Sequence, residues 1–274
     1  MNRIVENNMK QRVITAVVAL ILFIPIVLLG GLWIDWLVAL FAAVGISEVF
    51  IMKKQLLVSI DFVLALLATL TWTVPDSFFR QLPITKFGVY FGLIMLMLTW
   101  MVLSKNKSSF DDVGVYTLAS LYIGTGFHYM AAIRNTKIEA GLALLCFVFV
   151  IVWSTDIGAY MIGRKFGKHK LWPVISPNKT WEGSIGAVII AMIASTIYLH
   201  FFPLHHTLPT MLLLTFCLSV VGQMGDLVES AYKRFYGVKD SGKILPGHGG
   251  ILDRFDSMLF VLPVFAFFLG FTTI

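Results

Sequence analysis

Nine runs of mostly apolar residues, each about 20 residues long, dominate the chain and limit what it can fold into. They lie near residues 13–30, 32–52, 56–74, 87–104, 113–133, 140–162, 181–202, 208–228 and 251–273. A helix of about 20 apolar residues is long enough to cross the hydrocarbon core of a bilayer. Only 13% of the residues are charged, whereas a soluble domain carries about 25%. We therefore expect an all-α polytopic membrane protein with about nine transmembrane helices.

The first apolar run follows Arg3, Lys10 and Arg12, an arrangement that also occurs in secretory signals. The run is too long for the apolar part of a signal, and no small-residue cleavage site follows it. We interpret it as a retained transmembrane span. Gly30 and Gly31 separate it from the second run, which predicts a tight hairpin between the first two helices.

The basic residues predict the orientation, because cytoplasmic loops of membrane proteins are enriched in Lys and Arg. With a cytoplasmic N-terminus, sixteen of the 21 basic residues fall on the cytoplasmic side, four on the other, and one in the ninth run. The sixteen are Arg3, Lys10, Arg12, Lys53, Lys54, Lys105, Lys107, Arg164, Lys165, Lys168, Lys170, Lys179, Lys233, Arg234, Lys239 and Lys243. We expect this orientation, and we expect Glu48, near the cytoplasmic end of the second run, to lie at the membrane interface.

The polar residues are concentrated in the second half, which predicts two parts with different roles. Residues 1–138 have short loops and few motifs, so we interpret them as a transmembrane scaffold. Residues 139–274 form the predicted catalytic region, with three polar clusters on the cytoplasmic side. The clusters are STDIGAYMIGRKFGKHK (154–170), SPNKTWEGSIG (176–186), and GDLVES (225–230) continued by AYKRFYGVKDSGKILPGHGGILDRFD (231–256).

Three aspartates flank the loop between the last two apolar runs. Asp226 ends the eighth run, and Asp253 and Asp256 begin the ninth, where a spacing of three puts both on one helix face. The loop can return the chain so that Asp226 lies opposite this pair. Carboxylates without thiols or paired histidines favour Mg²⁺, which completes its shell with waters and substrate phosphates.

Basic residues and glycines around these aspartates favour phosphoryl chemistry, which needs cations to neutralise charge on phosphate oxygens. The basic residues are Lys179, Lys233, Arg234, Lys239, Lys243 and Arg254. Gly247, Gly249 and Gly250 allow backbone N–H groups to approach a phosphate at the start of a helix. The segment 176–180 precedes the seventh run and could cap that helix.

Plainer interpretations stay open for several of these residues. Asp226 and Glu229 could simply pair with Lys233 at the end of a helix. The aspartates of the ninth run could form a structural ion network with Arg254. A lone histidine such as His248 is more often a hydrogen-bonded structural group than a metal ligand.

The third cluster resembles the C-terminal motif of the phosphatidate cytidylyltransferases, the CDP-diacylglycerol synthases. The matching pattern is S-x-x-KR-x4-KD-x-G-x2-LPGHGG-x-LDR-x-D, from Ser230 to Asp256. Tyr232 stands where the family pattern has an aliphatic residue or Phe. The other two clusters also look like segments of this family, so the resemblance covers residues 150–260, while residues 1–140 match only as apolar spans.

The resemblance implies an integral membrane enzyme of about nine helices that is often a homodimer. It would use CTP and phosphatidic acid to make CDP-diacylglycerol and pyrophosphate for phospholipid synthesis. The bilayer is then a partner, and no nucleic acid is expected. The implied location is the bacterial cytoplasmic (inner) membrane, with the active site facing the cytoplasm.

The resemblance also implies roles for individual residues. By their place in the motif, Asp226 and Asp253 hold Mg²⁺, and the family associates a monovalent cation such as K⁺ with this centre. With the basic residues added, the expected catalytic residues are Asp226, Asp253, Asp256, Lys233 and Arg234. The expected substrate-binding residues are Asp156, Ser176, Asn178, Lys179, Lys239, Asp240, His248 and Arg254.

Other functions fit the sequence less well. A transporter with Asp156, Asp226 and Asp253 on a cation path would need polar residues at mid-depth in several spans, whereas here they gather at one face. A CDP-alcohol phosphatidyltransferase would carry an early DG-x2-AR element, which the sequence lacks. A cytidylyltransferase that acts on another lipid phosphate stays open.

Overall fold

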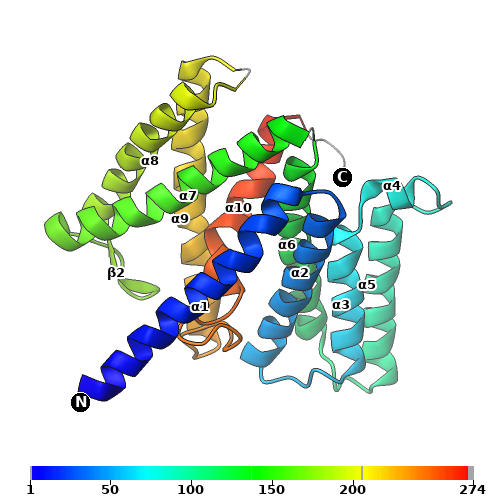
Figure 1. Ribbon diagram of the computed structural model, residues 1–274. Coiled ribbons are helices and arrows are strands. Elements are labelled where there is room, and N and C mark those ends of the chain that lie inside the picture. The colour runs from blue at the N-terminus through cyan, green and yellow to red at the C-terminus, as the bar shows by residue number, and fades with distance from the viewer. Residues whose placement is uncertain (1, 137, 205, 271–274) are drawn as a thin grey trace. The chain divides into compact units, whose positions relative to one another are not determined.

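The computed structural model describes residues 2–136, 138–204 and 206–270, which form ten helices and one two-stranded hairpin (Figure 1). By their internal contacts these residues separate into two compact units. The first unit contains residues 2–132 and 240–254, and the second contains residues 133–239 and 255–270. The loop from 240 to 254 therefore packs with the N-terminal helices, although it is distant from them in the sequence.

The first unit is built from the N-terminal helices α1 to α6. Their bounds are α1 Asn2–Leu29, α2 Leu32–Met52, α3 Ile60–Thr73, α4 Asp76–Phe79, α5 Lys86–Leu103 and α6 Phe110–Arg134. The expected break between the first two helices is present, and Gly30 and Gly31 both have positive φ angles (63° and 58°) that other residues rarely adopt. Helix α2 packs on α6, with Phe50 stacked on Tyr116 and their ring centroids 4.3 Å apart.

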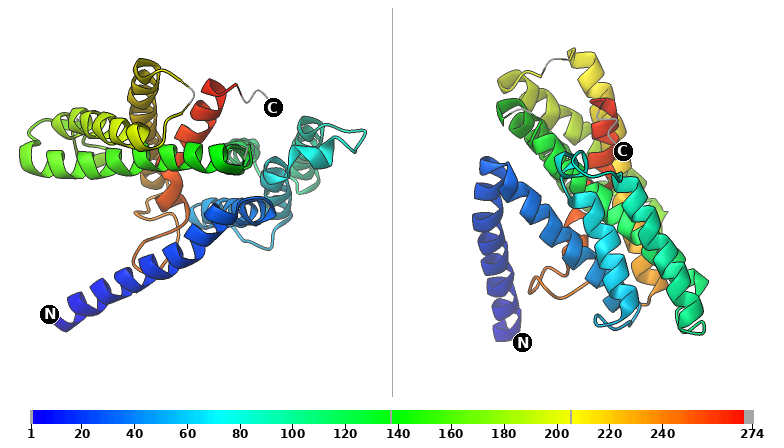
Figure 2. Two further views of the ribbon diagram at one scale, coloured as in Figure 1. Left: turned by 45° about the horizontal axis from the view of Figure 1, so that its top comes forward. Right: turned by 90° about the vertical axis from the view of Figure 1, so that its right-hand side faces the viewer.

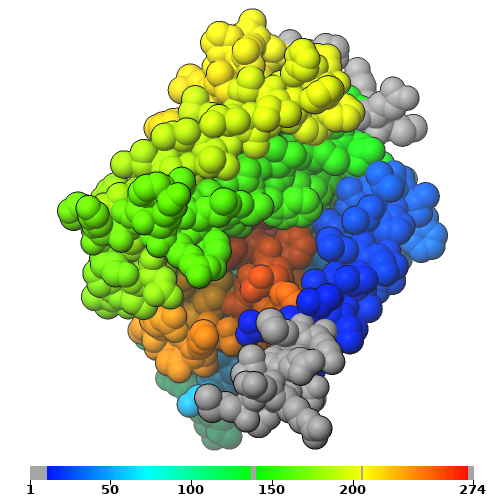
Figure 3. All heavy atoms as spheres, turned by 60° about the vertical axis from the view of Figure 1, so that its left-hand side comes forward, coloured from blue at the N-terminus to red at the C-terminus, as the bar shows by residue number. Residues whose placement is uncertain are grey.

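The second unit contains the remaining helices and the hairpin. Its elements are α7 Ile138–Phe166, β1 Lys170–Trp172, β2 Ser176–Thr180, α8 Trp181–Phe201, α9 Leu208–Phe235 and α10 Leu252–Phe268, of which the first three residues belong to the first unit. Helices α7 and α8 lie side by side (Figures 2 and 3). A Cβ atom on Gly186 of α8 would be only 2.6 Å from the Ile162 side chain of α7, so the two helices touch where this glycine lies.

Each of the nine predicted runs coincides with a helix, and six of the described helices are long and apolar enough to cross a membrane: α1 (from Gln11), α2, α5, α7, α8 and α9. Helix α3 has 14 residues, which is shorter than a span needs. The predicted start at residue 56 is wrong, because Ser59 caps α3 by accepting a hydrogen bond from the Phe62 N–H. Residues 271–273 of the ninth run lie outside the described residues. The chain is thus a helical, polytopic membrane protein.

The hairpin is a short non-helical element within a fold that is otherwise helical, as predicted. Strands β1 and β2 are antiparallel, with Lys170 opposite Thr180 and Trp172 opposite Ser176. Strands of three and five residues leave too short an alternation to be recognised between two long apolar runs. The predicted cap at this position is confirmed, since Thr180 ends β2 and its Oγ1 accepts a hydrogen bond from the Gly183 N–H of α8.

Two glycines of α6 provide a matched test of this packing. A Cβ on Gly124 would lie 2.7 Å from the Thr69 carbonyl and 2.9 Å from the Trp72 Cβ of α3, whereas a Cβ on Gly114 would meet nothing within 4 Å. We expect Gly124→Ala to lower the free energy of unfolding by roughly 1–3 kcal/mol through overpacking. Gly114→Ala should be neutral or raise it by up to about 1 kcal/mol. Thermal unfolding in detergent measures both, and equal effects would contradict the close contact of α3 and α6.

Candidate active site

A polar pocket of about 260 Å³ lies in the second unit, where α7, the hairpin, α8 and α9 meet. Asp156 and Tyr160 of α7, Asn178 and Lys179 of β2, and Asp226 of α9 are among the residues that line it. These residues come from all three polar clusters of the sequence. Four of the predicted site residues therefore surround one space, although they are far apart in the chain.

Lys179 and Asp226 form an ion pair in this pocket. The Lys179 Nζ lies 2.7 Å from Asp226 Oδ2 and 3.5 Å from the Gln223 carbonyl oxygen, to which it also donates. The other carboxylate oxygen, Oδ1, accepts a hydrogen bond from Ser230 Oγ at 3.3 Å. The side chains are 22% and 34% exposed, so solvent and ligands can reach both partners. A pair as exposed as this is worth about 0–1 kcal/mol, so its partners can exchange with little loss.

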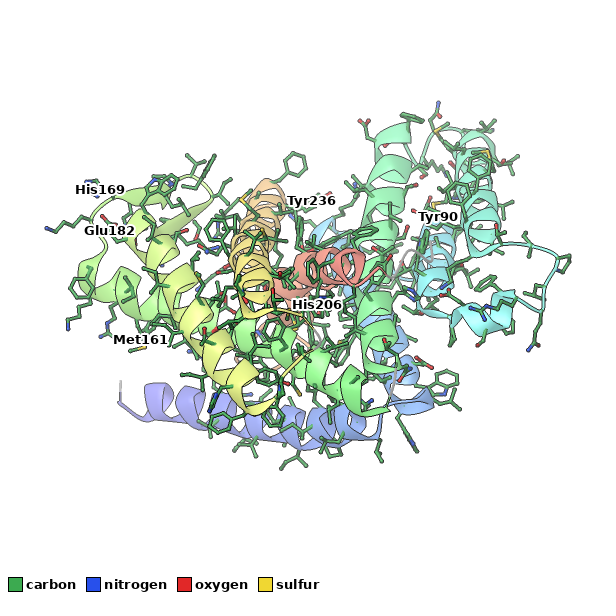
Figure 4. The ribbon with its side chains drawn as sticks, turned by 90° about the horizontal axis from the view of Figure 1, so that it is seen from above. Tyr90, Met161, His169, Glu182, His206 and Tyr236 are labelled. Atoms are coloured by element: carbon green, nitrogen blue, oxygen red, sulfur yellow. The ribbon has the colours of Figure 1, made fainter. Side chains whose placement is uncertain are left out.

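The hairpin and the start of α8 hold Lys179 in place. The start of α8 can approach α7 closely because residue 183 is a glycine. A Cβ at this position would lie 2.9 Å from the Ala159 carbonyl oxygen of α7. The Glu182 carboxylate accepts hydrogen bonds from the backbone N–H groups of Lys168 (3.1 Å) and His169 (3.2 Å) and contacts the His169 ring (Figure 4). Glu182 thus fixes the entry into β1 to the first turn of α8.

A second charged group lies buried between α9 and α10. Glu229 is 1% exposed and accepts a hydrogen bond of 2.7 Å from the Lys233 Nζ, one helical turn further on. The Asp256 carboxyl group of α10 lies close enough to Glu229, Asp226 and Lys233 to interact with them. Gly225 allows this approach, since a Cβ on it would be 2.7 Å from the Asp256 carbonyl oxygen.

These contacts decide between the interpretations that the sequence left open for α9. Lys233 does pair with a carboxylate of its own helix, but the partner is Glu229, and Asp226 pairs with Lys179 instead. Lys233 is also only 9% exposed. The structure therefore places Lys179 in the pocket and Lys233 in the interior of the unit.

Asp253 lies in the first unit, within a network made by the loop 240–254. Its Oδ2 accepts hydrogen bonds from the Ser241 N–H (2.8 Å), the Ser241 Oγ (3.0 Å) and the Gly250 N–H (2.8 Å). Gly247 and Gly249 have φ angles of 78° and 84°, and the loop closes on itself where Leu245 N–H donates to the Gly249 carbonyl at 3.0 Å. The glycine-rich run is thus a backbone turn that leads into Asp253, as expected.

Glu48 is buried among protein groups, and it is the main functional candidate that sequence reasoning missed. Its side chain is 2% exposed and accepts hydrogen bonds from Ser241 Oγ, Ile251 N–H and Leu252 N–H. The available signal was an ionisable residue inside an apolar run, which is costly unless it has partners. Those partners lie about 200 residues further along the chain, so the sequence around Glu48 does not indicate them.

The other predicted residues are on or near the surface. Arg234, at the end of α9, donates to the backbone carbonyls of Ile175 (3.4 Å) and Val238 (3.1 Å). Ser176 and His248 are half-buried, and the His248 Nδ1 has no hydrogen-bond partner among the described residues. The remaining three, Lys239, Asp240 and Arg254, are exposed.

The carboxylates of the second unit suit a hard cation. Among the side chains that the structure describes, no group of three or more His, Cys, Asp or Glu is gathered closely enough to hold a metal ion. Asp226 and Asp256 do lie near enough for their charges to interact. Because Mg²⁺ commonly takes one or two carboxylates and fills its shell with waters and phosphates, the donor set fits this ion.

Comparison with known proteins identifies the family to which the chain belongs. The sequence model of the cytidylyltransferase family matches residues 10–272. A Bacillus subtilis protein named phosphatidate cytidylyltransferase is 48% identical over 265 residues, which is 96% of this chain and 98% of that protein. Proteins of the same name from Staphylococcus haemolyticus and Staphylococcus aureus are 44% and 41% identical over 256 residues, covering 93% of this chain and 97% of each.

The fold and pocket thus define a polytopic membrane protein with a pocket that is lined by one lysine and two aspartates. The chain belongs to the cytidylyltransferase family, and its sequence resembles the phosphatidate cytidylyltransferases along nearly its whole length.

The two lysine–carboxylate pairs should differ in their effect on stability. Replacing Lys233 with Met leaves Glu229 buried without its charge partner, so we expect a loss of about 3–5 kcal/mol in the free energy of unfolding. The same replacement at Lys179 breaks a partly exposed pair and should cost at most about 1 kcal/mol. Unfolding of both variants in matched micelles measures this difference. A Lys233→Met protein as stable as Lys179→Met would show that the inner pair is not buried.

Proposed function

We propose that this protein transfers the cytidylyl group of CTP to phosphatidic acid, forming CDP-diacylglycerol and pyrophosphate. The observation that carries the proposal is the similarity, over more than nine-tenths of the chain, to proteins named phosphatidate cytidylyltransferase. The pocket in the second unit supports it, because residues of all three motif clusters line one space with both a cation and a carboxylate in it.

In the proposed reaction, a phosphate oxygen of the lipid attacks the α-phosphorus of CTP. The bond from that phosphorus to the oxygen that bridges to the β-phosphorus breaks, and pyrophosphate leaves with the bonding electron pair. The lipid phosphate is already anionic, so little base catalysis is required. Charge neutralisation between two polyanions and in-line placement of the reacting groups supply most of the rate enhancement.

Lys179 is the residue best placed to receive a phosphate. The ion pair between Lys179 and Asp226 is partly exposed and weak, so Lys179 can leave Asp226 and bind a phosphate oxygen. Asp226 can then bind a cation. Arg234 and Lys239 are exposed and near the end of α9, where they can bind the lipid phosphate or pyrophosphate. Lys233 would then act from the interior by keeping the Glu229 and Asp256 carboxyls in position.

The metal assignment rests on the motif. We propose that Asp226 and Asp253 hold Mg²⁺, that Asp256 belongs to the same centre, and that a monovalent cation such as K⁺ accompanies it. When bound, Mg²⁺ would supply positive charge to the triphosphate oxygens. Substrate contacts are proposed for Asp156, Ser176, Asn178, Asp240, His248 and Arg254.

The membrane arrangement follows from the charge distribution. We propose that the N-terminus and the polar clusters face the cytoplasm, because sixteen of 21 basic residues fall on that side of a nine-span topology. The lipid would then enter from the inner leaflet of a bacterial cytoplasmic membrane, at the depth of its headgroups. We also expect the protein to form a homodimer.

Radiolabelled CTP tests the reaction with purified protein. We expect label transfer to phosphatidic acid, and not to phosphatidylglycerol or diacylglycerol, only when Mg²⁺ is present. No turnover with phosphatidic acid under any divalent metal would refute the proposal. Label transfer to a different lipid phosphate instead would show that the acceptor is not phosphatidic acid.

Substitutions test the site with the same assay. Asp226→Asn and Asp253→Asn keep the shape of the side chain and remove its charge, so we expect each to lower kcat by at least about 100-fold. Asp111→Asn, the same change at an exposed residue outside all three polar clusters, is the matched control and should keep wild-type activity. Full Mg²⁺-dependent activity in either of the first two variants would refute the metal assignment.

A further inference from the structure

Glu48 is a buried carboxylate near the C-terminal end of the apolar helix α2, and its hydrogen-bond donors belong to one distant segment. The Ser241 Oγ donates to Oε2 at 2.8 Å, the Ile251 N–H to Oε1 at 2.7 Å, and the Leu252 N–H to Oε2 at 3.0 Å. Burying a charge at 2% exposure is costly unless hydrogen bonds compensate, and here three do so. The contact is therefore specific and cannot be attributed to general packing of α2.

The hydrogen bonds from Ile251 and Leu252 make Glu48 a cap for α10. Leu252 is the first residue of α10, so both N–H groups belong to the end of a helix that has no carbonyl partners of its own. A negative charge at this end also interacts favourably with the helix dipole. A carboxylate from α2 thus fixes where α10 begins and how its first turn is oriented.

Glu48 and Asp253 meet at a shared hydroxyl group. The Ser241 Oγ lies 2.8 Å from Glu48 Oε2 and 3.0 Å from Asp253 Oδ2. A serine hydroxyl has one proton, so it can donate to only one of the two carboxylates at a time. The Ser241 and Gly250 N–H groups donate to Asp253, and the N–H groups of Ile251 and Leu252, which follow Gly250, donate to Glu48.

The loop backbone is shaped around the Glu48 carboxylate. A Cβ on Gly242 would lie 2.7 Å from Glu48 Oε1, and a Cβ on Gly250 would collide with the same carboxyl group. One turn earlier on α2, a Cβ on Gly45 would be 3.0 Å from the Leu252 side chain. Gly242 and Gly250 therefore keep space for the Glu48 carboxylate, and Gly45 lets the Leu252 side chain approach α2.

We propose that Glu48 is a positioning residue that orients Asp253 by capping α10 and holding Ser241. The proposal rests on the proposed function, in which Asp253 binds the metal. It gives α2, which carries no part of the recognised motif, an indirect role in the reaction through Asp253. Residues that orient a metal ligand change metal affinity or activity by about 10–100-fold when they are altered.

The test compares Glu48→Gln with Ser47→Ala. The glutamine keeps the size of the side chain but replaces one acceptor oxygen with an NH₂ group that faces N–H donors. Ser47 is the neighbouring residue on α2, and its hydroxyl bonds only within its own helix, to the Val44 carbonyl at 2.7 Å, so it controls for local disturbance. Both variants are measured as full-length protein in detergent with wild-type protein alongside.

Three measurements are made on each protein. Hydrogen exchange of the peptides covering residues 240–256 reports on the α10 cap. Binding of Mn²⁺, followed by electron paramagnetic resonance, reports on the metal site without turnover. The Mg²⁺ concentration for half-maximal CTP:phosphatidate activity reports on the same site during turnover. For Glu48→Gln we expect faster exchange at Ile251 and Leu252 and a 10–100-fold weaker response to both metals. For Ser47→Ala we expect wild-type values.

A folded Glu48→Gln protein with wild-type exchange and metal response would overturn the proposal, and so would equal changes in Ser47→Ala. If Glu48→Gln does not fold, Ser241→Ala decides, because it removes the shared hydroxyl and keeps the Ser241 N–H donor. A raised metal requirement in Ser241→Ala supports the proposal, and an unchanged one refutes it. Absence of CTP turnover by wild-type protein would instead refute the proposed function, while exchange and Mn²⁺ binding would still test Glu48.

Discussion

A carboxylate among apolar side chains must be surrounded by hydrogen-bond donors, and the polar architecture of this protein depends on that requirement. In the first unit, Glu48 is satisfied by Ser241 and by the start of α10. In the second, the Glu229 Oε2 accepts a hydrogen bond from Lys233, and Asp256 lies close enough to interact with both residues. In both units, the donors lie beside residues of the recognised motif, so the energetic need to compensate buried charge also determines where the functional carboxylates lie.

The lysines of the second unit illustrate how exposure separates two roles for one residue type. Lys179 and Lys233 both make contacts of 2.7 Å with a carboxylate. The first pair is open to solvent, so water and phosphate oxygens compete for its lysine, and the pair is easily replaced. The second is enclosed, so removing either partner would leave a charge that nothing compensates. The same type of ion pair thus gives an exposed lysine, Lys179, that can exchange its partner, and a buried lysine, Lys233, that cannot.

Much of the fold could be predicted because apolar length is a local property. Every predicted run contains a helix, and the glycine break after the first is where it was expected. What failed depends on contacts at long range or on short elements. The pairing of Lys179 with Asp226, rather than Lys233 with Asp226, is decided by the β1–β2 register and the α8–α9 contact, which no spacing encodes. The partners of Glu48 lie at the other end of the chain, so its place in the run suggested only an interface.

The hairpin has a consequence for how the family can vary in length. Lys179 reaches the pocket while its neighbour Thr180 caps α8, and successive residues of a strand point to opposite faces. An insertion within 176–180 would reverse these two assignments, removing the lysine from the pocket and the cap from the helix. In the turn at 173–175, the Ile175 carbonyl accepts a hydrogen bond from Arg234, whereas Pro173 and Val174 are exposed and can accommodate changes in length. Evolutionary insertions and engineered tags are therefore compatible with the tip of the hairpin and not with its second strand.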